Sequence, residues 1–248
     1  MPTTPLHIVT GATRGIGRAV AAALAAREHR VVAVGRSTEL LDSLVETSGS
    51  LVSAVAADLA TKHGIDKLVA HIAAEGEIAS VLHSAGSLVP LEPYASIDSD
   101  ELVEHFRIHV GAPISLYQAV SRSHAIRRML FIDSYSASAA RLGWAAYSVI
   151  KSAAQMAARC AAQELPDTLT TRVFPGAVNT RIVETVLASD TATASTFAGM
   201  LERGEFAEPE EVAEFLVALF LDATDELFCS REAFDYNNPV DRADVGGI

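Results

Sequence analysis

Short, almost continuous runs of apolar and β-branched residues alternate along the chain with longer stretches rich in Ala and Leu. Runs of the first kind are typical of parallel strands buried on both faces, and stretches of the second kind are typical of helices. The predicted strands are residues 6–11, 30–35, 51–59, 78–86, 129–134 and 170–176. The predicted helices are residues 15–28, 40–47, 63–76, 99–123 and 143–165.

This alternation predicts an α/β fold: a doubly wound parallel sheet (a Rossmann fold) of about seven strands with helices on both faces. The chain of 248 residues has no repeat, low-complexity segment or linker, so a single domain over residues 1–248 is expected. Around residues 179–210, a region rich in Thr, Ser and Ala lacks a firm helical period, which favours a lid over a substrate. A pair of short surface helices is the alternative, and it is compatible with a lid.

The charge balance narrows the possible partners. With 31 acidic and 19 basic residues the formal net charge is −12, which argues against binding to nucleic acid or to anionic membranes. No apolar run approaches the length of a membrane span, and too few residues precede the first strand for a signal peptide. Cys160 and Cys229 are the only cysteines and lack metal-ligand spacing, so neither a disulfide framework nor a metal site is expected. A cytoplasmic protein is predicted.

A glycine-rich turn joins the first predicted strand to the first helix. It has the sequence TGATRGIG, in which Gly11, Gly15 and Gly17 let the backbone turn sharply and approach a ligand. Unpaired N–H groups at the start of the helix suit a pyrophosphate. Such a turn can also be purely structural. After the first strand of a parallel βαβ unit, however, it lies at the switch point where nucleotides bind, so a dinucleotide site is predicted.

Tyr147 and Lys151 lie four residues apart, on one face of the predicted helix 143–165. The spacing by itself is more typical of a packed ring beside a solvated amine. Ser134 ends the strand 129–134, thirteen residues before Tyr147. A serine at the end of a strand often only bonds the backbone. The pair and the serine acquire a chemical meaning when they are taken together with the glycine-rich turn.

The Gly-x-x-x-Gly-x-Gly turn, Ser134 and the Tyr-x-x-x-Lys helix, in this order, resemble the short-chain dehydrogenase/reductase family over about the first 185 residues. The segment Pro175–Thr180 resembles the family's turn that holds the nicotinamide amide. The resemblance implies that Tyr147 is the general acid/base and that Lys151 lowers its pKa and holds the ribose. It implies that Ser134 orients the substrate oxygen, in the reduction of a small carbonyl or dicarbonyl compound.

Cofactor preference depends on the end of the second strand. Family members that prefer NAD usually place an acid there, whereas this chain has Gly35 and Arg36. Arg14, in the glycine-rich turn, can point at the same place, and two arginines favour the 2′-phosphate of NADP. The alternative is that both arginines are solvated surface residues. Asp58 either bonds the adenine amino group, as its match to the family suggests, or caps the following helix.

The resemblance to the family implies a larger set of cofactor contacts. The residues expected to bind NADP are Gly11, Thr13, Arg14, Gly15, Ile16, Gly17, Arg36, Asp58, Leu59, Ser84, Ala85, Gly86, Tyr147, Lys151, Pro175, Gly176, Val178 and Thr180.

The chain departs from the family pattern at two histidines. His83 and Ser84 replace two asparagines after the fourth strand, and His109 replaces the asparagine of the catalytic tetrad. An imidazole can accept and donate, so His109 is expected to support the proton relay behind Lys151. Because it can also titrate, it is expected to add an inflection on the acid side of the pH–rate profile. A packed core histidine is the alternative.

Segments near both ends of the catalytic half narrow the resemblance further. GWAAYSVIK and FCSREAFDYNNP resemble the branch of sepiapterin and benzil reductases, which reduce small dicarbonyls and pterin ketones with NADPH. The first prediction is therefore an NADP-dependent carbonyl reductase that forms a homodimer or homotetramer. A catalytically weak NADP(H)-binding sensor or scaffold is the alternative, although Ser134, Tyr147 and Lys151 together argue against it. A sugar-nucleotide epimerase would need more chain for its substrate domain.

Overall fold

A computed structural model describes residues 4–189 and 192–246, and its centre is one parallel sheet. The strands follow the spatial order β3-β2-β1-β4-β5-β6-β7. This seven-stranded sheet with helices around it confirms the predicted fold class. The strands are β1 (Leu6–Thr10), β2 (Arg30–Gly35), β3 (Val52–Ala56), β4 (Ile78–His83), β5 (Ile126–Ile132), β6 (Leu169–Phe174) and β7 (Phe234–Asp235).

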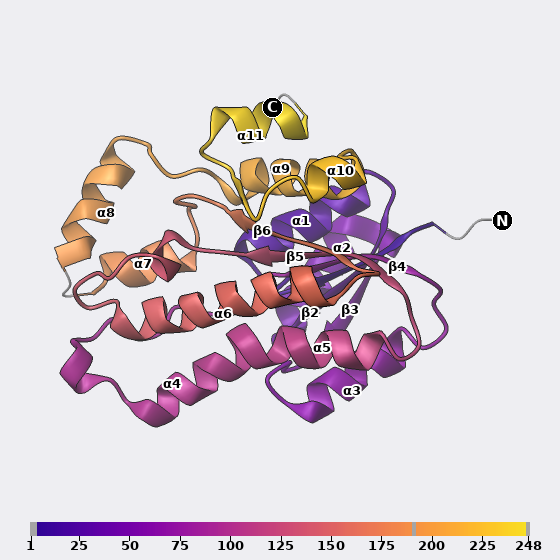
Figure 1. The fold of residues 1–248 in the computed structure, drawn as a ribbon, viewed down its shortest axis with the longest axis horizontal. Coiled ribbons are helices and arrows are strands. Elements are labelled where there is room, and N and C mark those ends of the chain that lie inside the picture. The colour runs from indigo at the N-terminus through magenta and orange to yellow at the C-terminus, as the bar shows by residue number, and fades with distance from the viewer. Residues whose placement is uncertain (1–3, 190–191, 247–248) are drawn as a thin grey trace.

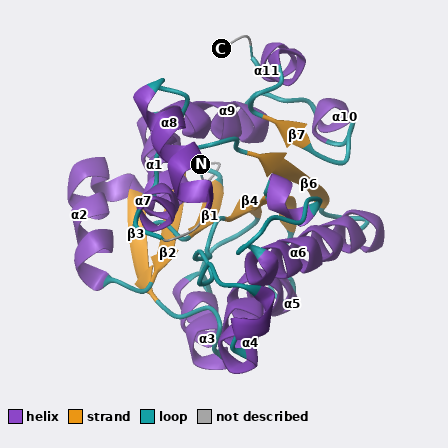
Figure 2. Ribbon diagram, turned by 90° about the vertical axis from the view of Figure 1, so that its left-hand side faces the viewer, coloured by secondary structure: helices purple, strands orange, loops and turns teal. Residues whose placement is uncertain are grey.

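Helices cover both faces of the sheet (Figure 1). Buried side chains of α1, α2 and α9 pack on one face, and those of α3, α5 and α6 pack on the other. Figure 2 shows the strands lying between these two helical layers. The helices are α1 (Gly15–Ala26), α2 (Thr38–Ser48), α3 (Lys62–His71), α4 (Ser99–Phe106), α5 (Ala112–Val120), α6 (Ala145–Glu164), α7 (Arg181–Leu187), α8 (Ala192–Glu202), α9 (Pro209–Leu221), α10 (Asp225–Phe228) and α11 (Pro239–Val245).

The strand order reverses between β1 and β4, and this reversal places the site. The chain winds outward from β1 to β3, then returns to β4 on the other side of β1 and continues to β7. The loops after β1 and β4 therefore diverge above and below the sheet and leave a crevice at the carboxyl ends of the strands. The core strands are apolar because both of their faces are covered: all five residues of β1 are buried.

Strand β5 begins earlier than the hydrophobic pattern predicts. The expected strand 129–134 starts at Ile126 in the structure and includes Arg128, whose side chain is almost completely buried. The Arg128 guanidinium donates to the carbonyl oxygens of Phe220 (2.7 Å) and Ala223 (2.8 Å) and pairs with Asp225 (2.6 Å). A charged residue can lie in this strand because the last turn of α9 and the chain that follows it supply its partners.

The predicted single helix 99–123 is wrong in its middle. A π-helical turn, Arg107–Gly111, separates α4 from α5. Pro113 has no N–H group, so it cannot donate the α-helical hydrogen bond to the carbonyl of His109. The wider turn buries His109 and Val110, and π turns of this kind frequently occur at functional sites.

The segment after β6 forms α7 and α8, which is the arrangement of two short helices named above as the alternative to an irregular lid. Residues 190 and 191, which also belong to the predicted lid segment, lie outside the described residues. The function of this segment as a lid stays a prediction. Within residues 4–189 and 192–246, no helix is both long enough and apolar enough to cross a membrane.

Candidate active site

A cavity of about 1410 Å³ opens at the carboxyl ends of the central strands. It is larger than the roughly 300–1,000 Å³ typical of a small-molecule pocket, which leaves room for a dinucleotide and a second small molecule. Every residue predicted from the sequence to be catalytic or to bind the cofactor lines this cavity except Gly17. Gly17 is a packing residue instead: a Cβ atom there would lie 2.5 Å from the Gly11 carbonyl oxygen.

The glycine-rich turn is held against the loop that follows β4. Gly11 has φ +71°, and a Cβ atom on it would lie 2.7 Å from the Ser84 carbonyl oxygen. Thr10 supports the same loop, because its Oγ1 accepts hydrogen bonds from the N–H groups of Ser84 (3.2 Å) and Ala85 (3.1 Å). The sequence analysis missed Thr10. The close approach leaves the backbone of both loops facing one crevice, which is the shape that a diphosphate requires.

His83 belongs to this support and not to the chemistry. Its Nε2 donates to the Ile108 carbonyl oxygen at 3.2 Å, which leaves Nδ1 to accept from the Thr10 hydroxyl, also at 3.2 Å. Burial, and next the charge of Lys151, lower the pKa of His83 to about 4. The ring is therefore neutral at physiological pH and connects β1 and β4 to the π-helical turn.

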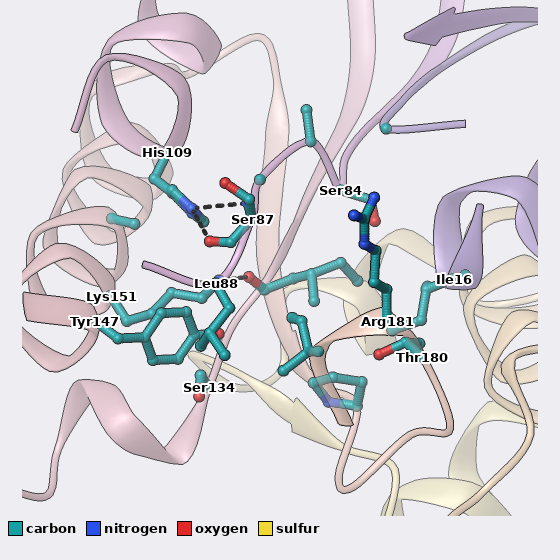
Figure 3. A pocket seen from close by; sticks show the side chains of 18 of the residues that line it. Ile16, Ser84, Ser87, Leu88, His109, Ser134, Tyr147, Lys151, Thr180 and Arg181 are labelled. Atoms are coloured by element: carbon teal, nitrogen blue, oxygen red, sulfur yellow. Dashed lines mark hydrogen bonds between the residues drawn. The ribbon is translucent and has the colours of Figure 1, made fainter. Parts of the chain in front are cut away.

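At the other end of the cavity, Tyr147 and Lys151 project from α6 beside Ser134, which follows β5 (Figure 3). Burial raises the pKa of Tyr147 to about 12; a hydrogen bond with Ser134 opposes this shift, and the charge of Asp133 adds to it. The resemblance implies instead a lowered pKa caused by Lys151, and that expectation is not met in this structure. The reason is that desolvation of the phenol is the largest effect.

Lys151 is fixed by the strand that precedes Ser134. Its Nζ donates a hydrogen bond to the Ile132 carbonyl oxygen at 2.9 Å. Burial lowers the pKa of Lys151 to about 8, and the nearby Asp133 carboxylate partly opposes this. A lysine with this pKa is still mostly charged at neutral pH. Among the surrounding groups that shift its pKa, only Asp133 favours the charged form.

An ion pair beneath Ser134 was not found from the sequence. Asp133 and Arg172 pair through Oδ2 and Nη1, and both side chains are almost inaccessible to water. Gln155 donates to the same oxygen at 3.1 Å, and the N–H of Ser134 donates to Oδ1 at 2.7 Å. The network fixes the backbone at Ser134. No local pattern reveals it, because Arg172 comes from the neighbouring strand β6.

His109 lies against the loop after β4 (Figure 3). Its Nε2 is 3.3 Å from the N–H nitrogen and 3.0 Å from the carbonyl oxygen of Ser87. A Cβ atom on Gly86 would lie 2.4 Å from the ring, so only glycine fits there. Burial, and next Lys151, lower the pKa of His109 to about 3, so the acid inflection expected from the sequence is wrong. No hydrogen bond joins His109 directly to Lys151 in the described part of the chain.

Arg14, Arg36 and Asp58, three charged residues that the sequence assigns to the cofactor, all line the cavity. Arg14 and Arg36 are exposed. A Cβ atom on Gly35 would lie 2.4 Å from the Thr13 methyl carbon, so a larger residue at the end of β2 would require the Thr13 side chain to move. Asp58 is not the cap of α3, because Thr61 has that position. Its Oδ1 accepts the N–H of Ala60 at 3.0 Å.

Aromatic and apolar side chains form the wall of the cavity beside Tyr147. Trp144 meets the Tyr147 ring edge-on at 5.7 Å between centroids, and its Nε1 donates to Thr193 of α8 at 2.9 Å. Phe197, also on α8, lies between Trp144 and Phe206. The helix α8 therefore adds an apolar surface to the end of the cavity that holds the predicted catalytic residues. Residues 4–189 and 192–246 contain no group of His, Cys, Asp or Glu side chains that could hold a metal.

Comparisons with known proteins agree with this geometry. A family model described as short chain dehydrogenase matches residues 6–191. An L-xylulose reductase from Cavia porcellus is 28% identical over 220 residues, which cover 86% of this chain and 87% of the relative. A benzil reductase ((S)-benzoin forming) from Bacillus cereus is 24% identical over 224 residues, covering 84% of this chain and 90% of the relative.

Solved structures show the same fold. The crystal structure of the KRED1-Pglu enzyme superposes with a TM-score of 0.85 at 27% identity, covering 93% of this chain and 100% of that one. The closed form of a serine dehydrogenase complexed with NADP+ superposes with a TM-score of 0.77 at 19% identity, covering 93% of each chain.

Proposed function

This chain belongs to the short chain dehydrogenase family, and from that premise we propose that it is an NADPH-dependent reductase of small carbonyl or dicarbonyl compounds. One observation carries the proposal: Ser134, Tyr147 and Lys151 line the same cavity as the glycine-rich turn. A protein that only bound a dinucleotide would not need a phenol, an ammonium and a hydroxyl gathered at one end of its cavity.

The residues present fit the cofactor. Gly11 comes so close to the Ser84 backbone that a Cβ atom would clash with it, which brings the glycine-rich turn and the loop after β4 together at the cavity, and Thr180 lies close to Gly15. The glycine-rich turn and α1 would hold the diphosphate. Lys151 would hold the ribose, and the turn Pro175–Thr180 the nicotinamide amide. When bound, the nicotinamide supplies the hydride.

The protein's own residues would supply the proton and the orientation. With its pKa raised to about 12, Tyr147 keeps its phenolic proton at neutral pH, which suits a donor to a reduced carbonyl oxygen. The Ser134 hydroxyl, held next to the buried Asp133–Arg172 pair, would bond the same oxygen and fix it near Tyr147. His109 would support the loop that carries Gly86 and Ser87.

Preference for NADPH is supported by Arg14 and Arg36. Both are free of acid partners among the described residues, and both line the cavity. A guanidinium beside a 2′-phosphate forms charge-assisted hydrogen bonds that a ribose hydroxyl cannot match. The end of β2 carries Gly35 and Arg36 in place of the acid that would favour NADH.

The wall formed by Trp144, Phe197 and Phe206 supports an apolar carbonyl substrate. The similarity to a benzil reductase agrees with this class. Consumption of NADPH by the purified protein, followed against a panel of diketones, quinones, pterins, sugars and acyl thioesters, tests the proposal. Turnover of aromatic diketones is expected. If the protein bound NADPH but turned over none of these compounds, the result would contradict the proposal and favour a sensor or scaffold.

We also expect a homodimer or homotetramer in the cytoplasm. Exposed apolar side chains on the adjacent helices α4, α5 and α6 support self-association (Figure 1); they are Val103, Phe106, Ile114, Val149 and Met156. Cys160 and Cys229 are exposed free thiols, which suits a reducing compartment. Light scattering of the purified protein tests the first expectation.

A further inference from the structure

The cavity has a charge balance opposite to that of the chain. Three carboxylates line it (Asp58, Glu104 and Asp133), against seven cationic side chains: Arg14, Arg36, Arg107, Arg141, Lys151, Arg172 and Arg181. Asp133 is already paired with Arg172. In a chain with a net charge of −12, this concentration of positive charge suits an anionic ligand.

Arg181 is one of several of these cations without a partner among the described residues, as are Arg14, Arg36, Arg107 and Arg141. It is the first residue of α7, directly after Thr180, and its side chain is exposed. The guanidinium forms no hydrogen bond or ion pair with any described residue. Glu184 lies three residues further along α7, at a spacing that allows pairing, yet no ion pair forms.

The direction of the side chain explains this lack of pairing. Figure 3 shows the Arg181 side chain running from its position beside Thr180 towards Ser84, and all three residues line the cavity. Thr180 itself packs close to the glycine-rich turn: a Cβ atom added to Gly15 would lie 3.2 Å from the Thr180 Cγ2 atom. Arg181 therefore faces, from the opposite wall, the crevice formed by Gly11, Gly15 and Ser84.

We propose that Arg181 is a binding residue for the diphosphate of the dinucleotide and closes over it from α7. The glycine-rich turn supplies backbone N–H groups on one side, and the guanidinium supplies a planar pair of donors on the other. The proposal rests on the proposed function, because it assumes a dinucleotide in the cavity. It adds that α7 is held by the cofactor.

Binding of small probes by the unmodified protein and by Arg181→Met tests this proposal. The probes are NADPH, NADH, ADP-ribose and 2′-AMP. ADP-ribose has the diphosphate but no nicotinamide, and 2′-AMP has no diphosphate. Titration calorimetry without substrate should show that Arg181→Met binds the first three about tenfold more weakly, as expected for the loss of a charge-assisted contact. Affinity for 2′-AMP should stay within about twofold. Arg181→Lys should recover part of the loss.

Arg122→Met is the matched control, because Arg122 is also exposed and without an acid partner but lies outside the cavity. Its affinities should match those of the unmodified protein. If ADP-ribose binds to Arg181→Met as tightly as it binds to the unmodified protein, the proposed contact between Arg181 and the diphosphate is overturned. A raised KM of this variant for the carbonyl substrate would then assign Arg181 to the binding of an anionic substrate. If the unmodified protein binds neither NADPH nor ADP-ribose, the proposed function itself fails.

Discussion

The Lys151 ammonium donates a hydrogen bond to the Ile132 carbonyl oxygen at 2.9 Å, two residues before Ser134. This bond connects α6 to the end of β5. It holds a positive charge at the end of β5, one turn along α6 from the predicted proton donor, Tyr147. The charge depends on pH in an accessible range, because burial lowers the pKa of Lys151 to about 8.

The pH dependence of carbonyl reduction should therefore report Lys151. Its charge is present below a pKa of about 8 and is lost as the pH rises through that value. We expect kcat/KM for NADPH, which reflects the free enzyme, to be level near pH 7 and to fall above pH 8. Lys151→Arg keeps its charge and should lose this inflection, at lower activity. A profile of the unmodified enzyme that is level to pH 10 would refute the assignment.

Stability should depend strongly on the buried pair of Asp133 and Arg172. Asp133→Ala leaves the Arg172 guanidinium buried with only Glu232 at 3.4 Å, and the free energy of unfolding should fall by about 3 kcal/mol. Urea unfolding measures this. The exposed pair Lys62–Asp66 offers the control, since Asp66→Ala should cost less than about 1 kcal/mol. If the free energy of unfolding fell equally in the two variants, the buried pair would contribute no more to stability than the exposed pair does.

Cofactor preference should follow Arg36. We expect kcat/KM to favour NADPH over NADH by at least about tenfold, because the proposed binding mode would give the 2′-phosphate charge-assisted contacts with Arg14 and Arg36. Arg36→Asp places a negative charge beside that phosphate and should abolish or invert the preference. Steady-state kinetics with both cofactors provides the measurement. Equal efficiencies in the unmodified protein would contradict the role of both arginines.

His109 should matter as a neutral residue. With a pKa lowered to about 3, it does not titrate between pH 5 and 8, so no acid inflection should come from it. His109→Leu deprives the Ser87 backbone of its partner and should reduce turnover about tenfold or more, whereas His109→Asn keeps hydrogen-bonding groups and should retain most activity. If the Leu variant matches the unmodified enzyme at every pH, His109 is only packing.

The sequence predicts the fold because the alternation of apolar strands and Ala-rich helices is a local pattern. It places the glycine-rich turn and the helix of Tyr147 for the same reason. What it cannot predict depends on contacts between distant segments. Arg128 looks unsuited to a buried strand until the carbonyls at and just beyond the end of α9 accept its hydrogen bonds, and Asp133 shows nothing unusual until Arg172 lies beside it.

The sequence does not predict the pKa values of Tyr147 and His109 correctly, because it does not show how deeply each side chain is buried. The charge of Lys151 was expected to lower the pKa of Tyr147, and His109 was expected to titrate. In the structure both side chains are buried, and desolvation is the largest influence on each pKa. The interruption of helix 99–123 had a visible cause in Pro113, but a proline also begins many helices, so its effect was ambiguous in the sequence.

Single-turnover reduction of an aromatic diketone by Tyr147→Phe with bound NADPH tests the central claim most directly. The variant removes one hydroxyl from a buried side chain, so the fold and the cofactor site should persist, and the Kd for NADPH should stay within about twofold. The rate should fall at least a hundredfold, because general acid catalysis commonly contributes about 10²–10⁴-fold. A Tyr147→Phe rate within about tenfold of the unmodified enzyme would contradict the assignment of Tyr147 as the proton donor.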